Sequence, residues 1–385
     1  MQPFLLASLL VAAVLGAAPL LKFDAFYPQR TLLFSNHPEP IAREYLAEAG
    51  VVLYRTNDDI RGPVRAWYEH LNWAGATISF GVYLYNPNKN PVNILVTGRG
   101  FTNKWNGGIP FVELFTPGFT PEQILVPGQS GKLLLQQDGI RNNTLTTGVV
   151  DFEVQATTPG AALTTVRVSF VAFVSSKSVT PDLPQIPYFI PGHSQEMLCY
   201  KGSSPVSDVQ ARQLNFVVSD STPSGALPVA YSAYDMDSQT FLEPVERTPF
   251  TSHIGPANTP AAVVLDNIAL LTPGWGYIHV LAKSDGNGGY PNWGNWAVTY
   301  HLYGSVTNQG KRDRLLQFRM GSPGDSPLAF QNSNGTWDSV IVEHSQGMST
   351  LYQTPLPAGQ TVPFAINYVM GGPGYGALTN EFLLQ

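Results

Sequence analysis

One short stretch of the sequence imitates a nucleophile elbow: GHSQE, from Gly192 to Glu196. An elbow of the G-x-S-x-G type holds its serine at a strained turn between a strand and a helix. Here four prolines precede the serine between positions 181 and 191, a β-type pattern follows it, and Glu196 replaces the last glycine. Because the flanking strand and helix are missing from the pattern, Ser194 is predicted to be a linker serine.

Two carboxylates lie close together in the sequence, Asp151 and Glu153. On a strand, side chains two residues apart point to the same face. A glycosidase needs two carboxylates about 5–9 Å apart across its substrate. On the outer face of a β-sandwich, solvated charges are the commoner explanation, so the sequence predicts no enzyme. An extracellular hydrolase is the third of three functional hypotheses.

Acidic side chains also follow part of the spacing of a calcium loop, in which oxygen ligands recur at positions 1, 3, 5 and 12. Thr240 occupies the position that requires glycine, and no helices are predicted on either side. Ordinary β-turns rich in Asp and Asn explain this stretch and the acidic loop SDGNGG that comes later. The prediction is no cofactor, with calcium as the alternative. The carboxylates that calcium would use are Asp235, Asp237, Glu246 and Asp285.

The seven histidines are scattered without the close spacing of a zinc or copper site, so no such site is predicted. The chain has one cysteine, Cys199, which excludes an intramolecular disulfide. With only Lys201 as a nearby cation, its thiol is predicted to be buried and unreactive.

Aromatic residues crowd into the segment 275–296, around a loop of Gly, Asn and Asp. Flat indole faces beside Asn and Asp side chains suit a sugar ring, which offers apolar faces and hydroxyl groups. The alternative is structural packing, with Trp296 beginning a core strand and Trp275 pointing inward. The candidate carbohydrate-binding residues are Trp275, Tyr290, Trp293 and Trp296.

The elements that would position these residues are strands. From 78 to 97 apolar and polar residues alternate on both sides of an Asn/Pro turn, which predicts an antiparallel hairpin. A related alternation runs from 296 to 320 around the turn VTNQGKRD. A second similar pairing follows each copy: LVPGQSGKLLLQ from Leu125 and LPAGQTVPFAINY from Leu356. The sequence therefore predicts two similar modules in tandem.

The predicted fold class is all-β, with two tandem antiparallel β-sandwich domains of Ig-like or jelly-roll-like type. We expect a signal peptide or N-terminal anchor at 1–21, domain 1 at 22–176, a Pro-rich linker at 177–202 and domain 2 at 203–385. The stretch PIAREYLAEAG is predicted to be a short helix that ends at Gly50. The final residues NEFLLQ are predicted to pair into a sheet.

Composition limits the classes of partner. Charged residues make up 12% of the 385 residues, about half of the roughly 25% usual in soluble domains. The formal charge of −6 includes no basic run, so nucleic acid and anionic membrane surfaces are excluded as partners.

The apolar run from Phe4 to Leu21 fits a signal peptide, and its length also fits a membrane anchor. Export with cleavage is predicted, and the chain would contact a membrane only if this segment stays uncleaved.

Four short motifs resemble the extracellular region of Gram-positive, Firmicutes-type surface proteins, which often also carry a copper amine oxidase-like N-terminal stalk domain. They are LLFSNHPEP (Leu32 to Pro40), GVVLYR (Gly50 to Arg55), RAWYEHLN (Arg65 to Asn72) and GNWAVTY (Gly294 to Tyr300). The sequence departs from this pattern at the insertion Ile41–Gly50 and at Glu69, where the family has His. The resemblance implies a secreted or surface location and two β-sandwiches, and it transfers no catalytic residue.

The resulting functional hypothesis is a secreted or cell-surface, non-enzymatic structural or adhesive protein. The first alternative is a carbohydrate-binding protein that uses the aromatic loop at 275–296. Cell-envelope glycans or other surface proteins are the expected partners, bound by loops at the ends of the sandwiches.

Overall fold

The structure is a computed structural model, and it describes residues 20–25, 30–36, 40–46, 50–156, 164–174, 201–204, 207–232, 234–235, 240–241, 245–247, 250–251, 296–373 and 378–385. These residues form an all-β protein, as the alternation in the sequence predicts. The one α-helix among them is α2 (Ile109–Phe115). No helix in these ranges is both long and apolar enough to span a membrane.

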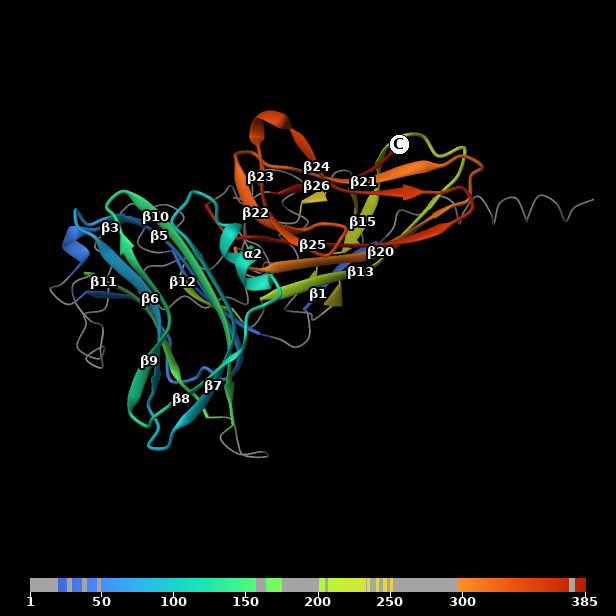
Figure 1. The fold of residues 1–385 in the computed structure, drawn as a ribbon. Coiled ribbons are helices and arrows are strands. Elements are labelled where there is room, and N and C mark those ends of the chain that lie inside the picture. Colours follow the sequence, from blue (N-terminus) through green and yellow to red (C-terminus); the bar gives the residue numbers. More distant parts are fainter. Residues whose placement is uncertain are drawn as a thin grey trace, which may run out of the picture.

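The first sandwich consists of a seven-stranded sheet facing a four-stranded sheet (Figure 1). Its strands are β2 (Thr31–Ser35), β3 (Ile41–Ala42), β4 (Val51–Arg55), β5 (Gly62–Trp73), β6 (Ile78–Asn86), β7 (Val92–Thr102), β8 (Glu122–Val126), β9 (Ser130–Ile140), β10 (Thr144–Gln155), β11 (Arg167–Val174) and β12 (Lys201–Ser204). The larger sheet has the order β12-β2-β5-β10-β7-β8 with β3 beside β5, and the smaller has the order β4-β11-β6-β9. Every second residue of β5, such as Val64 and Tyr68, enters the core between them.

The second sandwich consists of an eight-stranded and a five-stranded sheet. Its strands are β1 (Leu20–Ala25), β13 (Asp208–Val218), β14 (Gly225–Leu227), β15 (Val229–Ser232), β18 (Val245–Arg247), β19 (Phe250–Thr251), β20 (Thr299–Asn308), β21 (Arg314–Gly321), β22 (Ser326–Gln331), β23 (Trp337–Val342), β24 (Met348–Leu356), β25 (Thr361–Met370) and β26 (Thr379–Leu384). The larger sheet has the order β18-β15-β1-β13-β20-β25-β22-β23. The smaller has the order β14-β26-β21-β24, with β19 beside β26.

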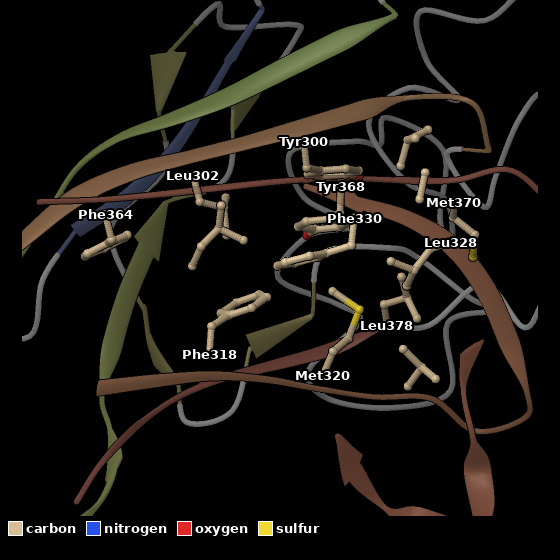
Figure 2. Packing of buried hydrophobic residues seen from close by; sticks show 14 of the residues in the cluster. Tyr300, Leu302, Phe318, Met320, Leu328, Phe330, Phe364, Tyr368, Met370 and Leu378 are labelled. Carbon is tan, nitrogen blue, oxygen red and sulfur yellow. The ribbon is translucent and has the colours of Figure 1, made fainter. Parts of the chain in front are cut away.

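Aromatic side chains fill the core of the second sandwich. Figure 2 shows the rings of Tyr300 and Tyr368 lying one above the other, with Phe318 and Met320 below them. The two tyrosine rings are 5.1 Å apart and nearly parallel. Phe318 continues the contacts to Phe382 at 5.3 Å. Because Phe382 belongs to β26, the last strand is paired and buried, which confirms the prediction made for NEFLLQ.

The two sandwiches exchange strands. The N-terminal strand β1 pairs with β13 and β15 of the second sandwich. In the opposite sense, β12 pairs with β2 of the first sandwich. The strand pairing therefore departs from the domain boundaries predicted from the sequence, because a strand near each boundary lies in the other sandwich. Alternation along a strand cannot reveal this, since it defines which face is buried and not which strand lies alongside.

The stretch 78–97 is not a hairpin, contrary to the prediction. β6 pairs with β9 and β11 in the smaller sheet, whereas β7 pairs with β8 and β10 in the larger one. The turn carries the chain across the core from one sheet to the other. Asn86 holds this turn: its Nδ2 donates to the carbonyls of Asn90 and Val126, and its Oδ1 accepts from the amide of Asn88.

The same arrangement recurs in the second sandwich, where β20 and β21 lie in different sheets. Asn308 Nδ2 donates to the carbonyls of Arg312 and Leu356, and its Oδ1 accepts from the amide of Gly310. The offsets of two and four residues along the turn equal those at Asn86. In each copy the same Asn also bonds to the second repeated stretch, at Val126 of LVPGQSGKLLLQ and at Leu356 of LPAGQTVPFAINY. The predicted internal repeat is therefore real at the level of single hydrogen bonds.

Each repeat carries an insertion after its crossing turn: α2 between β7 and β8, and the β22–β23 pair between β21 and β24. Figure 1 shows α2 between the two sandwiches, beside β22. Phe115 of α2 packs on Trp337 of β23, with ring centroids 4.4 Å apart. The two insertions therefore contact each other and join the sandwiches.

Three further details differ from the sequence predictions. Within the described part of the predicted helix, residues 40–46, the structure has a 3-10 turn at Arg43–Tyr45, preceded by β3. The helix α2 was missed, although the proline at its start is a usual helix N-terminal signal. Among the described strands, four pairs are parallel, β1–β15, β2–β5, β3–β5 and β13–β20, and the others are antiparallel.

Candidate functional site

The aromatic loop proposed for carbohydrate binding lies largely outside the part of the chain that the structure describes. Its residues Trp275, Tyr290 and Trp293 fall in the range 252–295. Trp296 is described: it is half-buried and packs against the core of the second sandwich. At Trp296 the structure therefore shows core packing, the alternative to carbohydrate binding that was considered for this loop.

The candidate calcium carboxylates are only partly described. Asp235 lies in β16 (Tyr234–Asp235), which pairs with β17 (Thr240–Phe241), whereas Glu246 lies in β18 and pairs with β15. Asp237 and Asp285, like Ser194 and Cys199, fall outside the described residues. No group of three or more metal-ligating side chains occurs within the described ranges.

The charged residues that the structure does bring together lie where the two sandwiches meet. Arg65, on β5, is fully buried. Its Nε and Nη2 donate to the two carboxylate oxygens of Asp151 at 2.9 and 3.0 Å. Its Nη1 donates to Thr299 Oγ1 at 2.8 Å and to the carbonyl of Ala297 at 3.3 Å. Arg65 thus connects β10 of the first sandwich to the start of β20 in the second.

A row of polar side chains extends this cluster across the outer face of the eight-stranded sheet. His301 Nε2 lies 3.5 Å from Asp208 Oδ1, on the neighbouring strand β13. On its other side, His301 Nδ1 lies 2.7 Å from Asn367 Oδ1. Asn367 Nδ2 then donates to Gln331 Oε1 at 2.7 Å. We call Arg65, Asp151, Asp208 and His301, together with Arg30, which forms an ion pair with Asp151, the junction cluster.

Opposite charges shift the pKa values of two members of the junction cluster, Arg65 and Asp208. Burial alone would lower the pKa of Arg65, but the carboxylates of Asp151 and Asp208 raise it above its ordinary value. Burial alone would likewise raise the pKa of Asp208. The positive charge of Arg65, with the contact from His301 Nε2, outweighs burial, so this pKa lies below that of an ordinary aspartate. Asp151 also forms an ion pair with Arg30, so two cations face two carboxylates.

Asp151 therefore is not the solvated charge that the sequence suggested, because it is buried and bound by two arginines. Glu153 does share its face, as predicted, but is half-buried and bonds only weakly to Gln155 at 3.4 Å. The sequence held a signal for the junction cluster: Arg65 interrupts an apolar strand pattern, and a buried cation requires a buried anion. The position of that anion could not be read from the sequence.

What the junction cluster can do follows from how its atoms are used. All three nitrogens of the Arg65 guanidinium are already bonded, to Asp151, Thr299 and Ala297. A substrate could reach this group only by breaking those bonds. Breaking a buried ion pair costs several kcal/mol. The arrangement therefore suits a fixed structural connection between the sandwiches better than a reactive centre.

The low pKa of Asp208 makes a prediction about acid stability. A carboxylate whose folded pKa lies below its unfolded value, about 3.9, stabilises the fold above that value. It loses this contribution as the pH falls further. We expect the free energy of unfolding, measured with urea at pH 7, 5 and 3, to fall more steeply below pH 4 in the parent chain than in Asp208→Asn. The exposed Asp59→Asn serves as the matched control and should keep the parent slope. Equal slopes in parent and Asp208→Asn would contradict the prediction.

Comparisons with known proteins add nothing to this picture. Neither a family model nor a curated protein matches the sequence. Among solved structures, the CupB6 tip adhesin from Pseudomonas aeruginosa is 10% identical, with 96% of each chain covered and a TM-score of 0.17. A Broad Bean Stain Virus structure is 11% identical, with 94% and 89% covered and a TM-score of 0.15. TM-scores this low carry no argument.

Proposed function

We propose that this chain is an exported, non-enzymatic structural or adhesive protein that works at or outside the cell envelope. The observation that carries the proposal is the bridge made by Arg65, which joins Asp151 of one sandwich to Thr299 of the other in a fully buried position. Two modules joined in this way behave as one stiff unit, as a structural or adhesive element requires.

Other features of the junction support the same role. Strands β1 and β12 cross between the sandwiches, so pulling the modules apart would also strip strands from sheets. Trp67 Nε1 donates to the carbonyl of Gly371 at 3.1 Å, and Ser339 Oγ donates to Asn106 Oδ1 at 2.6 Å. Interfaces between domains of one chain are usually small and permit relative motion. This one is held by aromatic packing, backbone contact and buried charge.

The location and the adhesive role are tested together on the full chain. Cells that express it with its own N-terminus would be fractionated, and intact cells would be treated with a protease. We expect the chain in the medium or in a protease-accessible form on the surface, because the apolar segment before Lys22 fits an export signal. Beads coated with the exported chain should then adhere to cell-envelope material. A chain retained wholly in the cytosol would overturn the proposal.

Carbohydrate binding is the second candidate, and a specific observation favours it. Two large aromatic side chains, Trp73 and Trp105, are exposed at the same end of the first sandwich. They are distinct from the aromatic loop singled out in the sequence, and exposed aromatics beside amides suit sugar rings.

A further inference from the structure

The end of the first sandwich where β5 and β7 finish and β10 begins carries unusual exposed residues. Trp73 is 56% exposed and Trp105 is 63% exposed. The register pairs Asn72 with Thr144, and Thr102 with Thr147, so both strand ends flank the start of β10. Neighbouring strands lie about 4.8 Å apart, which separates the two strand ends by roughly 10 Å. We call this region the aromatic end.

The indole of Trp73 is held in one orientation despite its exposure. Its Nε1 donates to Asn143 Oδ1 at 3.1 Å. Asn143 in turn has a positive φ of 61°. Its backbone N–H donates to the carbonyl of Asn72 at 2.6 Å, which fixes Asn143 beside the end of β5. A ligand that stacks on this ring would not have to order it first, so little conformational entropy is lost on binding.

Three asparagines at the aromatic end have their acceptor oxygens already engaged. Asn143 Oδ1 accepts from Trp73, and Asn142 Oδ1 accepts from the amide of Gly75 at 2.9 Å. Asn103 Oδ1 accepts from the side chain of Gln137. In each case the Nδ2 group makes no hydrogen bond to a described residue. The aromatic end therefore presents amide donors and few amide acceptors.

Two exposed cations also lie at the aromatic end. Two exposed carboxylates lie near them: Asp138, which accepts from Ser79 and Gln136, and Glu44, two residues after the Ala42 that pairs with Trp73. Lys104 lies beside Trp105, and Arg141 lies in the turn before β10; both are exposed. Neither forms an ion pair with a described residue. Such a surface complements a ligand rich in acceptor oxygens and negative charge, within a protein whose formal net charge is −6.

We propose that the aromatic end binds an acidic polysaccharide built from pyranose rings that carry carboxylate groups. The ring faces stack on Trp73 and Trp105, the asparagine amides donate to hydroxyl oxygens, and Lys104 and Arg141 contact the carboxylates. This inference rests on the adhesive role proposed above and supplies its ligand class. Stacking is what selects a sugar chain over any other polyanion.

The test is isothermal titration calorimetry of the full chain with three probes at low salt: hexagalacturonate, a neutral glucan hexamer and polyglutamate. We expect hexagalacturonate to bind more tightly than either of the others. Trp73→Ala should weaken its binding about fivefold, because an aromatic contact contributes about 1 kcal/mol. Lys104→Gln should weaken it about threefold, and this difference should vanish in 1 M salt, where charges are screened within roughly 3 Å.

Matched controls come from the opposite end of the same sandwich. Lys89→Gln removes an exposed cation in the turn before β7, and Leu125→Ala removes a 61% exposed apolar side chain on β8. Both should leave binding unchanged. Equal binding of polyglutamate, or unchanged binding by both Trp73→Ala and Trp105→Ala, would overturn the inference. If the chain is exported and adheres but does not bind hexagalacturonate, only the ligand class is wrong. If the chain is cytosolic and binds hexagalacturonate, the proposed location is wrong.

Discussion

Replacing Arg65 with methionine is expected to lower the free energy of unfolding by about 3–5 kcal/mol, the usual cost of leaving a buried charge without its partner. The substitution keeps most of the side-chain volume, but it leaves Asp151 and Asp208 in a buried site without the positive charge of Arg65. Arg30 remains beside Asp151, where it shares the Oδ2 atom with Arg65, but the bond to Thr299 is lost. Urea denaturation at pH 7 measures the change.

Two comparisons separate this effect from a general loss of charge. Arg312→Gln removes an exposed pair with Asp220 at 3.7 Å, whose side chains are 75% and 43% exposed; such pairs contribute about 0–1 kcal/mol. The double variant Arg65→Met with Asp151→Leu should recover part of the loss, because apolar packing replaces a buried pair with little penalty. A loss below 1 kcal/mol for Arg65→Met would show that the bridge does not hold the sandwiches.

Gly107→Ala is expected to disturb the docking of the two sandwiches, with a loss of about 3 kcal/mol or more. A Cβ at this position would lie 1.4 Å from the carbonyl oxygen of Gly372 and 2.4 Å from that of Gly371. Both obstacles are backbone, so neither can rotate away as a side chain could. The segment before α2 must therefore move off the second sandwich.

The change in shape distinguishes this variant from one that is merely less stable. We expect the radius of gyration from small-angle X-ray scattering to increase, and thermal unfolding to separate into two transitions as the modules uncouple. Gly118→Ala is the matched control: its φ of 123° strains any other residue, but no atom lies within 4 Å of its Cβ position. It should cost about 1–3 kcal/mol without changing the radius. An unchanged radius for Gly107→Ala would contradict the expectation.

For the fold, the sequence alone indicated the all-β class, most strand positions and the internal repeat. These follow from local rules: alternation marks a strand with one buried face, and Asn, Pro and Gly mark the turns. The repeat was visible because both copies need the same side-chain amide at the crossing turn. At Asn86 and Asn308 that amide satisfies carbonyls of the turn and of a strand end, which a buried backbone requires.

Only the tertiary structure decided which strands are partners. The stretch 78–97 has the pattern of a hairpin, but an arch between facing sheets buries the same alternate residues, so the pattern cannot separate them. The exchange of β1 and β12 has the same origin. The junction cluster depends on contacts across 86 residues from Arg65 to Asp151 and across 234 residues to Thr299. Such pairings arise when two sandwiches pack, and nothing local to Arg65 names the carboxylate that neutralises it.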